Sequence, residues 1–434
     1  MGHVLRKISL KEIFLTVIAL YLIVIFIRSA NASFILLSTL NYNFTTVEQG
    51  LIQGSYSLTE ALSGFASGLL YEYLGPRKSL LTASIMLTVS YSLSNLIYYE
   101  NIDPYLLILP QILGGFSASL IIVSSIALLA EETIYISYRR RLFGVGGLEA
   151  SNLLGYGLGF FVGGLLEVFA PQATKGFILT LIFSSLAFLM SILLREKVRE
   201  ELVYKKFYRE RFFNVERRSM YLVPMWAGVS IILGVAFISP RIIQKIFHLQ
   251  TGMYHPSFYH SSLGITLVIA VLLLSIAVLF GSFLSGYFGR ERSLLIGSLS
   301  SIAAIPLIGV LISRPEIYVT RSFSDMLKLI FSDPLITFLV FSLILFGALA
   351  FMIPPTLLTL LAEFTDKTRV RGPSSGVYVT TLGIGIFIGN VLGGYIFDKE
   401  GILILSIVLS IIFAPLSLLT YFLLKYKADI GRRR

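Results

Sequence analysis

Residues 68–80 read GLLYEYLGPRKSL and join two long apolar stretches of the chain. Within this short connection an acidic residue, Glu72, is followed by the basic pair Arg77 and Lys78. A helix needs roughly 20 apolar residues to cross the hydrocarbon core of a bilayer, and both flanking stretches reach that length. The sequence therefore predicts two membrane-spanning helices joined by a tight, charged loop.

The composition of the whole chain agrees with this local pattern. Of the 434 residues, 56% are hydrophobic and 14% are charged, whereas soluble domains carry roughly 25% charged residues. With short loops, a chain of this length has room for about a dozen membrane spans. The composition excludes a mainly soluble protein and leaves little sequence for a soluble domain.

Apolar stretches bounded by charged or turn-forming residues recur along the chain. Their approximate limits are 13–38, 47–70, 79–98, 105–130, 143–169, 176–194, 221–243, 263–287, 293–312, 334–361, 374–397 and 402–424. We therefore predict an all-α membrane protein with about 12 transmembrane helices in two pseudo-symmetric six-helix bundles. The predicted domains are an N-terminal half at 1–194, a cytoplasmic linker at 195–220 and a C-terminal half at 221–434.

The positions of lysine and arginine predict the orientation of these spans. The formal net charge is +11, and the basic residues concentrate in alternate loops, as the positive-inside rule expects for cytoplasmic segments. We therefore expect a multi-pass protein of the plasma membrane with both termini in the cytoplasm. Glutamates interleave with the basic residues of the linker, which favours a solvated segment over a nucleic-acid site.

A glycine pattern in the fifth predicted span is repeated in the eleventh. Both copies have the spacing G-x3-G-x3-G-G, and the offset between them is 230 residues: the glycines are Gly155, Gly159, Gly163 and Gly164, and then Gly385, Gly389, Gly393 and Gly394. Glycines four residues apart share one helix face and allow close approach of another backbone. We expect them to mediate helix packing, and their repetition supports two related halves.

The segment quoted first resembles the signature G-x-L-a-D-r-x-G-r-[RK]-x-x-L of the major facilitator superfamily (MFS). Gly68, Leu70, Gly75, Arg77 and Leu80 match, and Glu72 replaces the aspartate. A weaker second copy spans 282–294, with Gly286 at the acidic position. The resemblance covers essentially the whole chain and implies the MFS fold and secondary active transport. It also implies a gating loop formed by Gly68, Glu72, Gly75, Arg77, Lys78, Gly289 and Arg290.

Two physical interpretations of this loop remain open. An acidic side chain at a helix end can pair with nearby basic groups and a facing helix N-terminus in one conformation only, which would make Glu72 a gate latch. Alternatively, Glu72, Arg77 and Lys78 anchor a short loop at the lipid headgroups.

Two other segments depart from signatures of the family. The glycines of the fifth span resemble an antiporter-associated signature, but Phe160 occupies its proline position, and Asn390 does so in the eleventh span. In the fourth span, Pro110 and Gln111 stand where the family carries an arginine associated with proton coupling. The glycines thus favour an antiporter, and the missing arginine weakens that prediction.

Ionisable residues inside predicted spans are the main functional candidates. Arg28 lies about fifteen residues into the first span, Glu60 near the middle of the second, and Glu149 about two turns into the fifth. Arginine at membrane depth costs about 2.5–3.5 kcal/mol on insertion scales, so it normally faces a watery cavity or an acidic partner. Glu60 is the nearest counter-ion by depth; the alternative for Arg28 is snorkelling to the headgroups.

These residues and neighbouring polar side chains define a predicted substrate and proton cavity. Its members are Arg28, Asn31, Gln53, Tyr56, Glu60, Gln111, Glu149, Asn152 and Arg241. A buried glutamate can gain and lose a proton as a cavity opens to either side, which suits it to coupling. Each polar residue alone is also a common helix-packing group.

Other classes of chemistry find no support in the sequence. The chain has no cysteine and no G-x4-G-K-[ST], H-E-x-x-H or G-x-S-x-G motif, and its loop histidines, His248, His255 and His260, fit no standard ligand spacing. We expect no enzyme activity, cofactor or metal.

The sequence therefore predicts an alternating-access secondary transporter, with proton-coupled efflux of a small, partly apolar compound by antiport. The alternative is a permease for uptake of a small organic anion or other metabolite by symport; a non-transporting membrane sensor is more remote. Expected partners are a small-molecule substrate, protons or another coupling ion, and the lipid bilayer. We expect a monomer and no nucleic acid.

Overall fold

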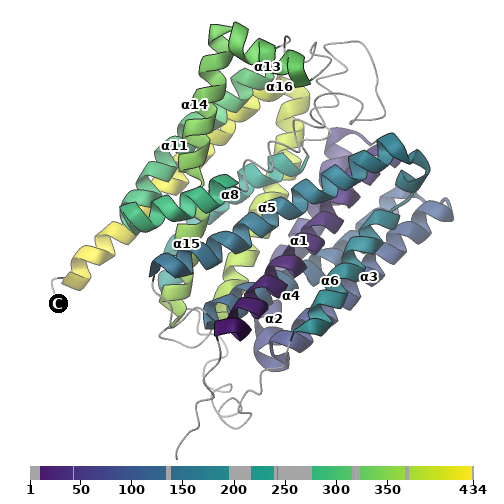
Figure 1. The fold of residues 1–434 in the computed structure, drawn as a ribbon, viewed down its shortest axis with the longest axis horizontal. Coiled ribbons are helices and arrows are strands. Elements are labelled where there is room, and N and C mark those ends of the chain that lie inside the picture. Colours follow the sequence, from purple (N-terminus) through teal and green to yellow (C-terminus); the bar gives the residue numbers. More distant parts are fainter. Residues whose placement is uncertain are drawn as a thin grey trace, which may run out of the picture.

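The computed structural model is a bundle of long helices that run alongside one another (Figure 1). It describes residues 10–42, 44–132, 138–194, 217–238, 242, 276–314, 316, 323–366 and 371–432. These segments contain helices and turns but no β-strand. The prediction of an all-α membrane protein with the MFS fold is confirmed.

Six helices form the N-terminal half and coincide with the first six predicted spans. They are α1 (Leu10–Asn41), α2 (Thr46–Leu74), α3 (Pro76–Tyr99), α4 (Ile108–Glu132), α5 (Tyr138–Phe169) and α6 (Ile178–Leu193). Short 3-10 turns, η1 (Pro104–Leu107) and η2 (Pro171–Thr174), precede α4 and α6.

The C-terminal half carries the other spans, with two departures from the prediction. Its described helices are η3 (Arg217–Leu222), α8 (Val223–Phe237), an apolar helix at Ile276–Phe288, α11 (Arg290–Ile312), α13 (Phe323–Ser332), α14 (Pro334–Ala350), α15 (Ile353–Asp366) and α16 (Arg371–Arg432). The sequence missed α13, which lies in a stretch expected to be a loop. It also missed the break that divides the tenth span into α14 and α15, where Pro354 and Pro355 remove two backbone donors.

Seven helical segments of the described chain are long and apolar enough to cross a membrane. One of them, Ser374–Lys425, holds the eleventh and twelfth predicted spans. The helices α2 and α5 are not among the seven, although they traverse the same bundle (Figure 1). These two helices carry Glu60 and Glu149 and are rich in glycine and polar residues, so they are suited to an interior surface rather than to lipid contact.

Local sequence signals explain where the helices begin and turn. At the start of α2, the Thr45 hydroxyl accepts from the Glu48 amide, and the Glu48 carboxylate accepts from the Thr45 amide at 2.7 Å. This capping box satisfies two donors that would otherwise lack partners. At the other end of α2, Gly75 has φ 81° and ψ 169°, a conformation open essentially to glycine alone.

The glycine at this turn has a counterpart in the other half. Gly289, between the helix at 276–288 and α11, has φ 79° and ψ 165°. Gly176 and Gly401, before the sixth and twelfth spans, form a second such pair with φ 74° and 80°. Glycines at positive φ therefore occur at equivalent turns of the two halves, in agreement with their pseudo-symmetry.

The repeated glycines pack equivalent helices together in each half. A Cβ at Gly159 would lie 2.4 Å from the Ser29 oxygen on α1, and one at Gly389 would lie 2.1 Å from the Ile231 oxygen on α8. Gly163 and Gly393 likewise face α1 and α8, whereas Gly394 faces Thr46 on α2 and Gly164 is buried. At Gly159 and Gly389 the backbones meet so closely that no larger residue fits without a shift of the helices.

The two halves meet along α2 and the first part of α16. A Cβ at Gly64 would lie 2.7 Å from the Gly376 oxygen, and the Thr380 hydroxyl donates to the Ala61 oxygen at 2.8 Å. Closer to the start of α2, Gly50 approaches the Asn390 oxygen in the same way. The predicted linker lies almost entirely outside the described residues.

The fold makes the predicted orientation testable with single cysteines, because the chain has none of its own. Lys78 and Asn101 are exposed at opposite ends of α3, and Glu400 is exposed beside Gly401. We expect Lys78→Cys to react with an impermeant maleimide only from the cytoplasmic side, and Asn101→Cys and Glu400→Cys only from outside. Labelling of Lys78→Cys and Asn101→Cys from one side would contradict the topology.

Candidate functional site

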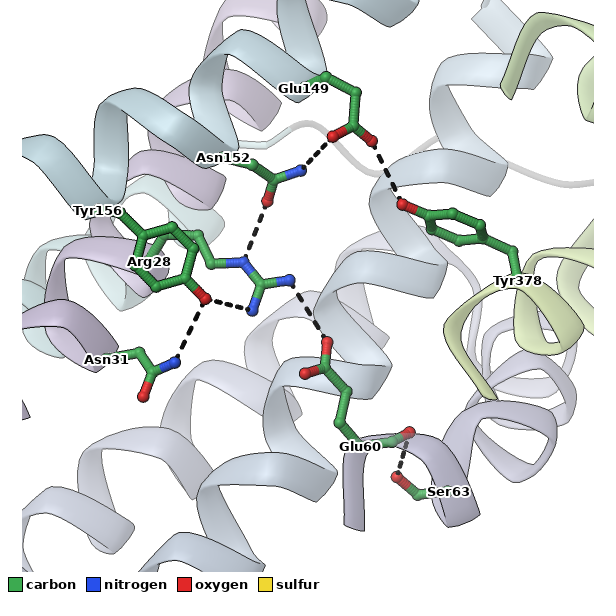
Figure 2. Close-up of polar contacts among 8 residues, drawn as sticks. All are labelled: Arg28, Asn31, Glu60, Ser63, Glu149, Asn152, Tyr156 and Tyr378. Atoms are coloured by element: carbon green, nitrogen blue, oxygen red, sulfur yellow. Dashed lines mark hydrogen bonds and ion pairs between the residues drawn. The ribbon is translucent and has the colours of Figure 1, made fainter. Parts of the chain in front are cut away.

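A buried guanidinium lies at the centre of the candidate site (Figure 2). Arg28, on α1, is 4% exposed and Glu60, on α2, is 1% exposed; Arg28 Nη2 lies 3.4 Å from Glu60 Oε1. Arg28 Nε donates to Asn152 Oδ1 at 3.0 Å, and Nη1 donates to the Tyr156 hydroxyl at 3.4 Å. Two helices, α2 and α5, thus satisfy the charge on α1, which the sequence predicted to need an acidic partner.

Polar side chains extend this network along α1 and α2. Asn31 Nδ2 donates to the Tyr156 hydroxyl at 3.4 Å, and Gln53 Nε2 donates to Asn31 Oδ1 at 2.9 Å. The Tyr156 hydroxyl therefore accepts from both Asn31 and Arg28 (Figure 2). The structure brings five of the predicted cavity residues into one continuous network: Arg28, Asn31, Gln53, Glu60 and Asn152.

The second carboxylate joins the network through an amide. Asn152 Nδ2 donates to Glu149 Oε2 at 3.4 Å, and the Tyr378 hydroxyl donates to Glu149 Oε1 at 3.3 Å. Tyr378 belongs to α16, so this contact crosses from the N-terminal to the C-terminal half (Figure 2). The ring of Trp226, on α8, meets the Tyr378 ring edge to face at 4.4 Å between centroids.

The remaining predicted cavity residues are less connected. Tyr56 and Gln111 are buried, and within the described structure the Tyr56 hydroxyl and both amide atoms of Gln111 have no hydrogen-bond partner. Neither side chain therefore has a hydrogen bond to the Arg28 network in the described structure. Arg241 lies outside the described residues, as do the three loop histidines. Among described residues, no group of three or more His, Asp or Glu side chains could hold a metal.

Three aromatic residues of the site were not predicted from the sequence. A helical periodicity could have indicated Tyr156, because Glu149, Asn152 and Tyr156 follow the spacing i, i+3, i+7 of one helix face. Tyr378 and Trp226 have no comparable signal, since they approach from the other half and lie among many apolar neighbours in sequence.

Contacts between the halves lie on both sides of Arg28 along the bundle. Toward the Gly75 end, Glu149 meets Tyr378; toward the opposite end, the rings of Tyr156 and Phe237 lie 4.7 Å apart. Phe237 is on α8, so each contact joins the N-terminal to the C-terminal half. The charged network therefore lies between these two side-chain contacts along the bundle.

The predicted gating loop lies at the Gly75 end of the bundle. Arg77 Nη2 donates to the Ile192 oxygen in the last turn of α6 at 3.3 Å, and Lys78 is exposed. In the second copy, Arg290 Nη1 lies 2.7 Å from Glu363 Oε2 near the end of α15. The second copy therefore has an acidic partner after all, supplied by α15 rather than by the position of Gly286.

The comparisons agree with this fold. A sequence model of the Major Facilitator Superfamily matches residues 17–323. An uncharacterized MFS-type transporter of Methanocaldococcus jannaschii is 24% identical over 363 residues, covering 82% of this chain and 84% of the relative. The solved proton:xylose symporter XylE has a TM-score of 0.67 at 13% identity and 95% coverage of each chain. The human organic anion transporter MFSD10 (TETRAN) has a TM-score of 0.62 at 14% identity, covering 94% of this chain and 99% of that one.

Helices in two related halves, with an ionisable network enclosed at their interface, define a membrane transporter of the secondary type. The chain belongs to the Major Facilitator Superfamily. The family prediction is confirmed, and membership of this transporter family points away from catalysis.

The Arg28–Glu60 pair makes a testable contribution to stability. We expect Arg28→Leu to lower the free energy of unfolding by about 3–5 kcal/mol, because it leaves a buried carboxylate without its partner. Adding Glu60→Leu should recover part of this loss, since the double variant buries no uncompensated charge. Thermal unfolding in detergent of both single variants and the double variant measures the coupling; strictly additive effects would show that the pair contributes nothing.

Proposed function

We propose that this protein is an alternating-access secondary transporter that couples proton entry to efflux of a small, partly apolar compound. One observation carries the proposal: a buried arginine and glutamate, Arg28 and Glu60, form an ion pair inside a network that reaches both halves. Ionisable side chains at membrane depth are costly to maintain, so they are the primary candidates for coupling.

The geometry supports a specific role for the proton. A proton bound to Glu60 removes the negative charge that holds Arg28, and so frees the guanidinium for another partner. Proton and substrate would then occupy the site in alternation, as exchange requires. The contacts of Tyr156 with Phe237 and of Glu149 with Tyr378 would open in turn as the halves rock.

The remaining parts of the proposal concern the whole molecule. We take 1–194 and 221–434 as the two rocking halves and 195–220 as the cytoplasmic linker between them. The protein is proposed to act as a monomer in the plasma membrane, with both termini in the cytoplasm, and to exchange its substrate for protons or another coupling ion. The distribution of basic residues and the pseudo-symmetry of the fold support this arrangement.

Uptake of a small organic anion by symport is the second candidate. Arg28 favours it, because a guanidinium binds carboxylates through parallel hydrogen bonds. The other residue invoked for this alternative, Arg241, lies outside the described residues. MFSD10 is an organic anion transporter and XylE a proton:xylose symporter, but at 13% and 14% identity these likenesses speak for the fold alone.

The proton role of Glu60 is tested in inverted vesicles with an imposed pH gradient. A panel of small apolar compounds identifies those that the wild-type protein accumulates in a gradient-dependent way. For such a compound, we expect Glu60→Gln to abolish accumulation and to flatten the pH profile, since glutamine can neither bind nor release a proton. Glu100→Gln, in an exposed turn, serves as the matched control.

Two results would count against this assignment. Unaltered accumulation and pH profile in Glu60→Gln would exclude Glu60 as the proton carrier. If the compound instead accumulates in the direction of proton flow, the protein is a symporter and the efflux proposal is wrong.

The first copy of the gating loop is proposed to latch the Gly75 end of the two halves. Glu72 lies in the last turn of α2, about two turns beyond Gly64, where the backbones of α2 and α16 approach closely at Gly376. A carboxylate at this position lies near the N-terminus of α16, whose dipole favours negative charge. The contact would exist only while the Gly75 end is closed.

The latch predicts that Glu72→Gln shifts the protein toward the cytoplasm-open state without preventing folding. Spin labels at Lys78→Cys and Arg292→Cys, exposed at the starts of α3 and α11, report the separation of the halves at this end. We expect longer distances in Glu72→Gln than in the parent and in the Glu100→Gln control. Unchanged distances would leave Glu72 as a headgroup anchor only.

A further inference from the structure

Glu149 stands beside the Arg28 network without sharing its ion pair. Asn152 separates the two residues, since it accepts from Arg28 Nε and donates to the Glu149 carboxylate. In the described structure, the only ion pair of Arg28 is with Glu60, and Glu149 has none. Glu149 and Asn152 are only partly buried, unlike Arg28 and Glu60, so this carboxylate is the more accessible of the two.

Among the described residues, the ionisable groups of the site leave one negative charge uncompensated when both carboxyl groups are ionised. The described network contains one permanent cation, Arg28, and two carboxyl groups, Glu60 and Glu149. With both carboxyl groups ionised, the net charge is negative by one. A charge in a medium of low dielectric constant is costly unless a counter-charge accompanies it, so the site requires one more positive charge, either a proton or a cationic ligand.

Aromatic groups accompany the uncompensated carboxylate. The Tyr378 hydroxyl donates to Glu149, and the Trp226 ring packs on the Tyr378 ring. Trp226 is 3% exposed, so its ring is buried together with the Tyr378 ring in the described structure. A carboxylate beside tyrosine and tryptophan rings matches the chemistry that recognises organic cations.

We propose that Glu149, Tyr378 and Trp226 form the binding site for an organic cation, an apolar or aromatic ammonium or phosphonium compound, within the transport cavity. This inference rests on the proposed function, because it names the substrate class of the same exchanger.

Arg28 would then relay competition between the proton and the cation. With Glu60 ionised, Arg28 pairs with Glu60, and the cation neutralises Glu149. When a proton neutralises Glu60, Arg28 is free to compensate Glu149 across Asn152, and the cation loses its counter-charge. In both states the network is neutral and holds either one proton or one monovalent cation, which is the charge balance of one-for-one exchange.

The groups that face Glu149 determine its response to pH. Arg28 reaches it from α1 through Asn152, Tyr378 reaches it from α16, and Glu60 acts through Arg28 from α2. Tyr21, on α1, lies against Gly147 and donates to the Gly144 oxygen. Ser282 and Pro355, which approach Gly146 from the C-terminal half, carry no charge. Lower pH therefore weakens cation binding through protonation of Glu60 or of Glu149 itself.

Two ions of matched shape and opposite charge test the substrate class. Tetraphenylphosphonium and tetraphenylborate carry the same four phenyl groups and differ in the sign of their charge. Trp226 is the only tryptophan of the chain, so its fluorescence in the purified protein reports occupancy of the site directly. We expect saturable quenching by tetraphenylphosphonium, with affinity that falls as the pH falls, and none by tetraphenylborate.

Variants separate the roles of the two carboxylates. Glu149→Gln should weaken phosphonium binding at least about tenfold at pH values where both carboxyl groups of the wild type are ionised. Glu60→Gln should bind weakly and lose the part of the pH dependence that Glu60 causes, because it imitates the protonated state. Tyr378→Phe keeps the ring and should remain within about threefold of wild type, whereas Tyr378→Leu should lose about tenfold. Glu100→Gln is the control. Trp226→Leu should also bind weakly. Because this variant lacks the fluorophore, its binding is measured by equilibrium dialysis with tritiated tetraphenylphosphonium.

Binding in detergent is independent of transport, so its failure differs from failure of the proposed exchange. Wild-type affinity in Glu149→Gln, absence of saturable phosphonium binding, or preferential binding of tetraphenylborate would each overturn the cation site. Loss of gradient-driven accumulation in vesicles, with phosphonium binding intact, would overturn proton coupling and leave the site in place.

Discussion

The buried guanidinium of Arg28 is the constraint on which much of the N-terminal half depends. A charge at membrane depth is tolerated only when its donors are satisfied, and two helices contribute to that end: α5 supplies Asn152 and Tyr156, and α2 supplies Glu60. The same constraint explains a glycine on α5: a Cβ at Gly155 would lie 2.6 Å from the Cβ of Arg28. The close packing of α1 against α5 is therefore also what brings the hydrogen-bond acceptors on α5 to the Arg28 guanidinium.

Two kinds of contact hold the helices together. Glycine faces join backbones inside each half, as on α5 against α1, and also between the halves, where Gly64 on α2 meets Gly376 on α16. Near Arg28, the halves also meet through side-chain ends: a 3.3 Å hydrogen bond from Tyr378 to Glu149 and an aromatic contact of Tyr156 with Phe237. Side-chain contacts of this type can break with rotation of a few bonds, whereas the backbone contacts can change only by movement of whole helices.

The sequence predicted most of the helices and the charged centre because both reflect the free-energy cost of placing polar or charged groups in the core of a bilayer. Apolar length and charge placement determine the spans, and an arginine at membrane depth demands a partner, so Glu60 could be named at a separation of 32 residues. Tyr378 lies 229 residues from Glu149, and its contact depends on helix rotation and on docking of the halves, which no local pattern encodes. The amphipathic α13 was missed because a ten-residue helix is too short to stand out from a loop.

The different partners of Arg28, Glu60 and Glu149 bear on whether the substrate is an anion or a cation. Arg28 Nε, Nη1 and Nη2 each donate to a protein acceptor, so an anion must displace one of these acceptors. With both carboxyl groups ionised, it also adds a negative charge to a described network that already has one in excess. A cation needs no such displacement, because Glu149 has hydrogen-bond donors but no counter-ion in the described structure. The arrangement therefore favours a positively charged substrate. The proton competes with this substrate, because either one supplies the single positive charge that neutralises the site.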